Sequence, residues 1–188
     1  MGVELSRYKN RHGSKNKLRR LVWEVVWTVL FRTTPRWCLN GWRCFLLRAF
    51  GAKIGSSVRI QGGTKVWQPW KLTIGDNSWI DGGVSLYSVD EIRIGSNAVI
   101  SDGAFICTAT HDISSETFEL QTRPVAIGDC AWVCAKSIVL PGIMVGEGAV
   151  AGAGSVVTKD IAPWSVVAGN PAKEIKKRVL KGRQILLP

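Results

Sequence analysis

Aliphatic residues recur at every sixth position along much of the chain, and this period restricts the possible folds more than any other feature. The longest regular run is Ile127, Val133, Val139, Val145, Ala151 and Val157. A helix repeats about every 3.6 residues and a strand about every two, so neither produces this period by itself. Short flat strands joined by tight turns do produce it, and about three such units close one coil. The period therefore predicts an all-β solenoid with a continuous aliphatic core.

An Ile-Gly or Val-Gly pair opens five copies of the repeat. The pairs begin at Ile54, Ile74, Ile94, Ile127 and Val145. The first three begin twenty residues apart, which we interpret as a coil of about eighteen residues with a bulge of about two at a corner. Gly, Asn and Asp lie near the corners, where a positive φ or a tight turn is needed. A sandwich of short strands would instead give irregular turn spacing.

The net charge of +11 is concentrated at the N-terminus. Residues 1–53 hold twelve Lys or Arg and two acidic residues, whereas residues 54–188 hold thirteen and twelve. Two compatible interpretations of residues 18–50 stay open. They cover the open end of the solenoid, or they lie on an anionic membrane surface, since Trp and Arg mixed with aliphatic residues are typical of interfacial helices. Nucleic acid is not an expected partner, because the basic stretch contains no recognisable binding motif.

Helical spacing is visible only in this N-terminal segment. The aliphatic residues between Leu21 and Leu30 recur at positions that place them on one side of a helix. Pro35 is expected to separate this helix from a second, which would run from Arg36 to Phe50. We therefore divide the chain into a basic, Trp-rich helical segment (1–53), a β-helix (54–173) and a C-terminal tail (174–188).

The sequence favours a cytoplasmic protein, with peripheral contact at the inner face of the membrane as the open alternative. Residues 1–20 are polar and do not resemble a signal peptide. No stretch reaches the roughly 20 apolar residues that a membrane span needs. Five cysteines, an odd number without a CxxC motif, indicate free thiols in a reducing compartment and neither a disulfide framework nor a zinc site.

The repeat is interrupted by an insertion at residues 107–124, and the candidate catalytic residue lies in it. An insertion in a solenoid projects from one face, where function usually resides. His111 is the only histidine in the repeat region. Imidazole is the usual general base for moving an acyl group onto a hydroxyl. Asp112 or a backbone carbonyl could orient the ring, and the sequence does not decide between them. No nucleophile motif is present.

Several motifs resemble known acyltransferases. The Ile-Gly hexapeptides, the loop Thr108-x-x-His111-Asp112 and the closing segment Val167-Ala-Gly-Asn-Pro-Ala-Lys173 resemble the left-handed β-helix acyltransferases. The stretch from Trp42 to Gly55, and Pro69-Trp-Lys-Leu-Thr-Ile-Gly-Asp76 with the Leu-Tyr-Ser that follows it, resemble more narrowly the colanic acid biosynthesis acetyltransferases.

This resemblance implies a left-handed parallel β-helix of hexapeptide repeats that forms a homotrimer with active sites between subunits. It implies acetyl-CoA as the donor and a sugar hydroxyl, in exopolysaccharide or cell-surface glycan biosynthesis, as the acceptor. It matches His111 to the catalytic base and requires no metal.

The resemblance also implies binding residues for both substrates, the acetyl-CoA donor and the sugar acceptor. The residues matched to the acetyl-CoA site are Ala135 and Ala153 at the pantetheine arm, Thr158 and Lys159 at a nearby turn, and Lys173 and Lys176 at the nucleotide phosphates. Several sugar acetyltransferases carry Arg at the last two positions, and Lys offers a point charge in place of a bidentate fork. A solvated basic tail is the alternative for these two lysines.

On the acceptor side, Ser85 and Asp90 match polar sugar-binding positions. Tyr87 and Trp79 could stack on a sugar ring or simply pack on the surface.

Three other functions use the same solenoid. A γ-class carbonic anhydrase needs three zinc-binding histidines, and only His111 lies in the repeat, so this class is excluded. A serine or xenobiotic acetyltransferase would share the reaction with a different, small acceptor. A non-enzymatic β-helix scaffold would not release thiol from acetyl-CoA.

Overall fold

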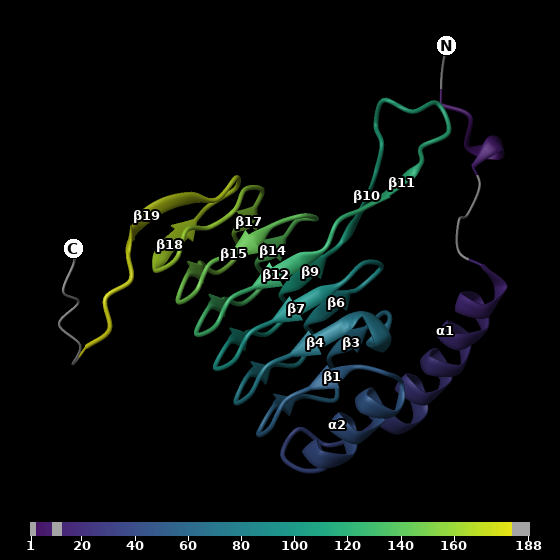
Figure 1. Ribbon diagram of the computed structural model, residues 1–188, viewed down its shortest axis with the longest axis horizontal. Coiled ribbons are helices and arrows are strands. Elements are labelled where there is room, and N and C mark those ends of the chain that lie inside the picture. Colours follow the sequence, from purple (N-terminus) through teal and green to yellow (C-terminus); the bar gives the residue numbers. More distant parts are fainter. Residues whose placement is uncertain (1–2, 9–12, 182–188) are drawn as a thin grey trace.

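The computed structural model describes residues 3–8 and 13–181, and most of them form a left-handed parallel β-helix (Figure 1). Three stacked sheets make up its walls. Sheet 1 contains β1 (Lys53–Ile54), β4 (Leu72–Ile74), β7 (Ile92–Ile94), β12 (Val125–Ile127) and β15 (Met144–Val145). Sheet 2 contains β2 (Arg59–Ile60), β5 (Trp79–Ile80), β8 (Val99–Ile100), β13 (Trp132–Val133), β16 (Val150–Ala151), β18 (Ser165–Ala168) and β19 (Lys173–Lys177). Sheet 3 contains β3 (Lys65–Val66), β6 (Ser85–Tyr87), β9 (Phe105–Cys107), β14 (Ile138–Val139) and β17 (Val156–Val157).

The six-residue period corresponds to one step around the coil. Ile127, Val133 and Val139 lie on sheets 1, 2 and 3 in turn, and all three side chains are buried. The five predicted repeat starts are in register along sheet 1, where each pairs in parallel with the next. Side chains of one type therefore stack from coil to coil, and the prediction of a continuous aliphatic core is confirmed.

Tight corners require left-handed backbone, and the chain supplies it with a wider set of residues than expected. Asn77 and Asn97 occupy equivalent corners with φ of 57° and 55°, as their type predicts. Ser57 and Cys130 fill the same corner in other coils with φ of 53° and 57°. The corner geometry is thus imposed by the stacking of coils, even where the residue itself disfavours it.

The twenty-residue coils carry their extra residues at one defined corner. From sheet 1 to sheet 2 and from sheet 2 to sheet 3 the step is six residues, whereas from Val66 to Ile74 it is eight. The short helix η3 (Pro69–Lys71) occupies this corner in the first coil. The long insertion leaves the solenoid after β9, at the same corner between sheets 3 and 1. The bulges and the insertion therefore lie along one edge of the molecule.

Helices close the N-terminal end of the solenoid. They are α1 (Ser14–Val26), the π-helical turn η2 (Trp27–Phe31) and α2 (Asn40–Ala49), whereas the short η1 (Leu5–Arg7) lies beside the long insertion (Figure 1). The inner faces of α1 and η2 pack on the first coil, where the indole Nε1 atoms of Trp23 and Trp27 donate to the carbonyls of Val66 and Thr64 at 2.7 and 2.8 Å. No helix in the described ranges has the length and hydropathy needed to cross a bilayer.

The second helix begins four residues later than predicted. Leu39 has a left-handed φ of 60°, so helical backbone starts only at Asn40. The irregular segment before it is held by Arg43, which is buried and whose guanidinium donates to the carbonyls of Ile60, Pro35 and Cys38. A buried cation with several carbonyl partners fixes a turn that helix propensity alone does not reveal.

Candidate functional site

His111 lies on a two-stranded hairpin that projects from the solenoid (Figure 1). The hairpin consists of β10 (Ala109–His111) and β11 (Leu120–Thr122), which pair antiparallel with His111 opposite Leu120. The rest of the insertion forms the hairpin tip. The imidazole is half-buried at the point where the strands open into this tip. The predicted projection of the insertion is therefore observed, with the histidine at its neck.

A backbone carbonyl orients the imidazole. His111 Nδ1 lies 2.8 Å from the carbonyl oxygen of Phe118. A carbonyl can only accept, so Nδ1 carries the proton and Nε2 is left with a free lone pair. The imidazole also stacks on the Phe118 ring, with centroids 4.6 Å apart and planes at 12°. This tautomer and orientation suit a general base acting through Nε2.

The Asp112 carboxylate accepts hydrogen bonds within the hairpin and does not orient the imidazole. It accepts from the backbone and hydroxyl of Ser114 at 2.9 and 2.6 Å and from the Gln121 amide at 3.0 Å. The hydroxyl bond from Ser114 is the main cause of a lowered pKa for Asp112. Of the two orienting groups that the sequence left open, the structure thus selects the carbonyl.

The N-terminal segment packs against the same hairpin. The backbone N–H of Glu4 donates to the carbonyl of Glu116 at 2.8 Å. The Tyr8 ring lies 6.1 Å from the His111 ring, centroid to centroid. Glu4 and Tyr8 therefore lie against the hairpin that carries His111, a contact that no local sequence signal indicates.

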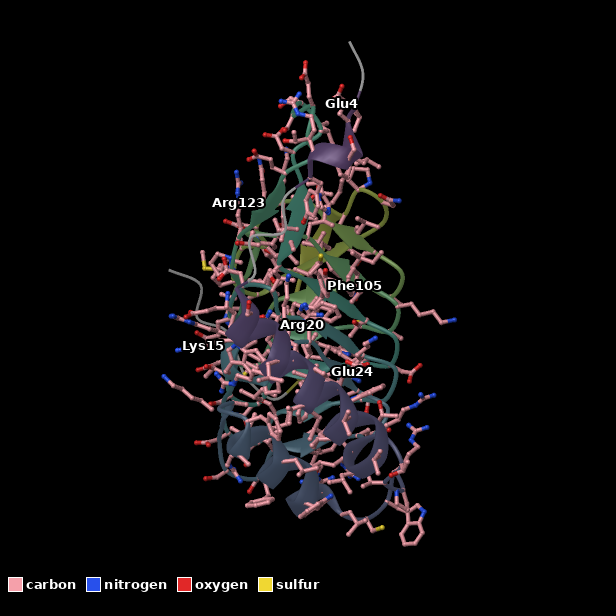
Figure 2. All side chains as sticks on the ribbon, turned by 90° about the vertical axis from the view of Figure 1, so that its right-hand side faces the viewer. Glu4, Lys15, Arg20, Glu24, Phe105 and Arg123 are labelled. Carbon is pink, nitrogen blue, oxygen red and sulfur yellow. The ribbon has the colours of Figure 1, made fainter. Side chains whose placement is uncertain are left out.

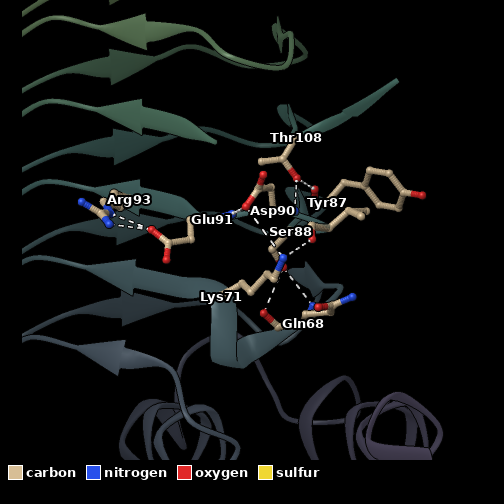
Figure 3. A network of polar contacts seen from close by, with 9 residues as sticks. Gln68, Lys71, Tyr87, Ser88, Asp90, Glu91, Arg93 and Thr108 are labelled. Carbon is tan, nitrogen blue, oxygen red and sulfur yellow. Dashed lines mark hydrogen bonds and ion pairs between the residues drawn. The ribbon is translucent and has the colours of Figure 1, made fainter. Parts of the chain in front are cut away.

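Asp90 lies at the base of the hairpin, in a polar network at the bulged corner (Figure 3). The buried Thr108 hydroxyl accepts from the Asp90 N–H at 2.8 Å and donates to the Tyr87 carbonyl at 2.7 Å. Lys71 lies 3.7 Å from the Asp90 carboxylate, and its Nζ donates to the Val89 carbonyl at 2.6 Å. The structure thus connects Asp90, through Thr108, to the strand that carries His111.

Aromatic side chains extend from this corner across sheet 3. The Tyr87 ring lies 5.0 Å from the ring of Trp67 and 6.1 Å from that of Phe105. Ser85 lies two residues before Tyr87 on β6, on the same face of the strand. Burial raises the pKa of the Tyr87 phenol, so it stays protonated and can donate a hydrogen bond. Trp79 is not part of this group, because it lies on sheet 2 with the Arg59 guanidinium 4.6 Å from its ring.

The residues matched to the acetyl-CoA site fall at three places on the C-terminal coils. Ala135 and Ala153 lie in equivalent positions at the corner between sheets 2 and 3, where Gly154 N–H donates to the Ala135 carbonyl at 2.9 Å. Thr158 and Lys159 follow β17 at the corner between sheets 3 and 1, and both are exposed.

Lys173 and Lys176 lie on the terminal hairpin of β18 and β19, opposite Ala168 and Val166. Both lysines are exposed. Within the described residues, the ion pair of this hairpin joins Lys177 to Glu174 at 2.8 Å, and neither Lys173 nor Lys176 takes part in it. Their charges are therefore available to an anion.

Two cysteines near these residues are not activated thiols. Cys107 is buried four residues before His111, and its Sγ donates to the Ala109 carbonyl at 3.0 Å. Burial raises the pKa of the Cys107 thiol, and also that of Cys134 next to Ala135. A buried, protonated thiol is a poor nucleophile, so the geometry does not favour an acyl-enzyme.

The sequence patterns indicated the histidine but not its partners. Phe118, Thr108 and Lys71 contribute through the fold of the insertion and the corner. The backbone at Phe118 is left-handed, with φ of 51°. The sequence does not predict this, because bulky residues rarely adopt a positive φ. Among the described residues, no group of three His, Cys, Asp or Glu side chains is placed to hold a metal ion.

Relatives of the chain in sequence are named acetyltransferases. The putative colanic acid biosynthesis acetyltransferase WcaF of Escherichia coli K12 is 42% identical over 164 residues, which cover 87% of this chain and 90% of that protein. A putative acetyltransferase of Staphylococcus aureus is 49% identical over 74 residues, which cover 37% of each chain. No protein-family model matches the chain.

Solved acetyltransferase structures share the fold. A maltose O-acetyltransferase from Clostridium difficile 630 superposes with a TM-score of 0.83 at 29% identity, covering 89% of this chain and 90% of that one. A galactoside acetyltransferase in complex with coenzyme A gives a TM-score of 0.82 at 23% identity, covering 89% and 84%. A hexapeptide-repeat acetyltransferase from Vibrio cholerae, in complex with acetyl-CoA, gives 0.81 at 21% identity, covering 90% and 92%.

Proposed function

Because the chain belongs to the hexapeptide-repeat acyltransferases, in the family of the colanic acid biosynthesis acetyltransferases, we propose that it acetylates a sugar hydroxyl in exopolysaccharide or cell-surface glycan biosynthesis, with His111 as the general base. Membership of this family makes the chain an acetyltransferase that uses acetyl-CoA. The observation that carries the catalytic assignment is the bond between His111 Nδ1 and the Phe118 carbonyl, because it leaves Nε2 free to accept a proton.

In the proposed reaction, His111 Nε2 takes the proton of the acceptor hydroxyl while its oxygen attacks the thioester carbonyl. A carbon–oxygen bond forms, the carbon–sulfur bond breaks, and the imidazolium returns the proton to the departing thiolate of coenzyme A. Backbone N–H groups are suited to stabilise the oxyanion of the tetrahedral intermediate. Both substrates must be bound together, so ternary-complex kinetics are expected.

On the donor side, the proposal assigns the pantetheine arm to the small residues Ala135 and Ala153 and the adjacent turn to Thr158 and Lys159. The exposed Lys173 and Lys176 would neutralise the nucleotide phosphates as point charges. Ala153 is exposed and Ala135 is half-buried, and such small side chains at an outer corner leave the backbone accessible to an extended ligand, which supports this part of the assignment.

On the acceptor side, the proposal assigns sugar hydroxyls to Asp90 and Ser85. Asp90 would accept through its carboxylate, which Lys71 approaches to 3.7 Å. The structural relatives named for maltose and galactoside support a sugar acceptor, and the name of the relative from Escherichia coli supports a polysaccharide precursor.

We further propose a homotrimer that works in the cytoplasm. The hairpin with His111 projects away from the coils (Figure 1), and Ala135 and Ala153 lie at the opposite corner of sheet 3. Each side of the coil contains about six residues, so at roughly 3.3 Å per residue it is about 20 Å wide. A hairpin that reaches over a neighbouring protomer would therefore complete the site.

Replacement of His111 by Ala tests the proposed function. The variant His111→Ala should lower kcat/KM by about 10²–10⁴, the usual contribution of a general base. The measurement is thiol release from acetyl-CoA with a panel of sugars, nucleotide sugars, serine and chloramphenicol as acceptors. Cys107→Ala is the matched control, because this thiol lies nearby but faces the Ala109 carbonyl, and it should retain nearly full activity.

Three results would contradict the proposal. Turnover of His111→Ala close to that of the wild type would remove the histidine from the mechanism. A preference of the wild type for serine or chloramphenicol over every sugar would replace the glycan acceptor by a small one. Absence of thiol release with every acceptor would favour the scaffold function.

A further inference from the structure

The first helix, together with the π-helical turn η2 that continues it, is apolar on two opposite faces. Its inner face packs on the solenoid through the buried side chains of Trp23, Trp27 and Phe31. Its outer face exposes Leu18, Leu21, Val22, Val25 and Val29, with 47–63% of each side chain accessible. At about 100° per residue, the four of these that lie on α1 fall within an arc of about 100°. A helix that only covers the end of a solenoid should present a polar outer face, so this outer face needs a partner.

The exposed apolar surface continues onto the second helix. Trp42 and Phe45 stack on the outside of α2 with centroids 5.6 Å apart. The Trp42 indole donates to the Leu30 carbonyl at 3.0 Å, which joins this aromatic pair to the end of η2. Trp37, in the connection between the helices, is 87% exposed. We call these outer faces of α1, η2 and α2, with the connecting Trp37, the helical face.

Positive charge surrounds the helical face. Lys15 and Lys17 are exposed on α1, and Arg32 and Arg36 are exposed where the helices are joined. Glu24 is the only acidic residue between positions 13 and 53. Figure 2 views the molecule from this side and shows α1 in front, with Lys15, Arg20 and Glu24 labelled along it. An aliphatic stripe with Trp and Phe, flanked by Lys and Arg, has the composition of a helix that lies in a membrane interface.

The charge distribution also argues against a second copy as the partner. Two copies meeting through the helical face would place two segments of net charge +10 against each other. The remaining 135 residues carry a net charge of only +1 and offer little compensation. An anionic lipid surface satisfies both properties of the face, because it accepts apolar side chains below its head groups and attracts the cations around them.

We propose that the helical face docks on an anionic membrane with α1 and α2 parallel to the surface. Figure 1 shows α1 along the side of the solenoid that also bears the hairpin with His111. Glu4, just before η1, is hydrogen-bonded through its backbone N–H to the hairpin tip. Docking would therefore bring the hairpin close to the lipid surface, which suits a lipid-linked acceptor. Only this last point rests on the proposed function.

Binding of the full chain to vesicles tests the proposal. Wild-type protein should sediment with vesicles that contain phosphatidylglycerol, bind much more weakly to vesicles of phosphatidylcholine alone, and dissociate as the salt concentration rises. The double variant Leu21→Gln, Val25→Gln keeps the charge and the helix propensity but makes the centre of the stripe polar. It should lower the partition coefficient by at least about tenfold.

A double variant elsewhere on the surface is the matched control. Met144→Gln, Val179→Gln replaces two apolar side chains that are comparably exposed, 56% and 71%, outside both the helical face and the hairpin. It should bind vesicles as the wild type does. Circular dichroism establishes that both variants are folded, and acetylation of a soluble sugar by the Leu21→Gln, Val25→Gln variant separates this proposal from the proposed function.

Three outcomes would overturn membrane docking. The first is wild-type protein that does not bind anionic vesicles. The second is equal loss of binding in both double variants, which would make the effect non-specific. The third is a smaller sedimentation coefficient for the Leu21→Gln, Val25→Gln variant with unchanged vesicle binding, which would assign the helical face to contacts between copies of the chain.

Discussion

At the scale of single residues, the site depends on which group holds the histidine. His111 is held by a carbonyl of its own hairpin, whereas the adjacent Asp112 bonds Ser114 and Gln121 across the turn. A carbonyl partner fixes the tautomer without adding a negative charge beside the imidazole. If the Phe118 carbonyl orients the imidazole, replacing the Asp112 carboxylate by an amide should affect catalysis little. If Asp112 orients it, the same replacement should impair catalysis strongly.

Asp112→Asn should therefore have a small effect on catalysis. We expect kcat/KM to fall by less than about tenfold, since the amide oxygen still accepts from Ser114 and the imidazole keeps its carbonyl partner. Loss of a carboxylate that orients a catalytic imidazole costs about 10⁴ in other enzymes. Steady-state kinetics of the Asp112→Asn and His111→Ala variants under the same conditions distinguish the two cases. A loss of about 10⁴ in both would show that Asp112 is the orienting group in the active enzyme.

At the scale of elements, the first helix has one face that stabilises the fold and one that does not. Trp23 is 1% exposed, donates from Nε1 to the Val66 carbonyl, and packs its ring on those of Phe31 and Phe50 at 6.0 and 5.0 Å. Leu21 lies two residues earlier and faces outward. Both positions lie on the same helix in the same charge environment, but only Trp23 is packed against the rest of the protein.

Trp23→Ala should lower the free energy of unfolding by about 3–5 kcal/mol, the usual cost of removing a buried Trp side chain. Leu21→Ala is the control and should change the free energy by less than about 0.5 kcal/mol, because it truncates an exposed side chain and keeps helix propensity. Urea unfolding at one fixed protein concentration measures both, since an oligomer's stability depends on concentration. Similar losses at the two positions would mean that the outer face is also packed.

The elements that a short-range pattern specifies could be predicted from the sequence, and those fixed by contacts across the chain could not. The six-residue period placed Ile127 and its successors on the sheets they occupy. The second helix was expected from Arg36, but the buried Arg43 and the left-handed Leu39 delay it. Left-handed corners were expected at Gly, Asn and Asp, whereas Cys130 shows that stacking can impose them on other residues.

The same limit applies to the candidate site. Imidazole chemistry and an interrupted repeat were sufficient to single out His111. Its orientation depends on Phe118, whose carbonyl reaches the imidazole only because the hairpin closes with His111 opposite Leu120. Asp90 is connected to the hairpin by Thr108 through a bond across two coils, and its spacing in the sequence gives no sign of this.

At the scale of the whole molecule, the separation of the two halves of the site predicts shared active sites. The hairpin leaves the solenoid at the corner between sheets 3 and 1, whereas Ala153 lies at the corner between sheets 2 and 3. In a ring of protomers, the hairpin of one chain would meet the Ala153 corner of the next. Light scattering of the purified protein should then give three times the chain mass of 20.6 kDa.

Two inactive variants should restore activity when they assemble together. His111→Ala removes the proposed base, and Ala153→Trp blocks the proposed pantetheine path from an exposed position. If each site combines His111 of one protomer with Ala153 of another, mixed trimers assembled at random from equal amounts contain intact sites at about one quarter of their interfaces. Coexpression of the two variants should therefore give about a quarter of wild-type activity, while each variant alone stays inactive. If one protomer supplies both residues, every site in the mixture is defective, and activity no higher than that of the separate variants would show it.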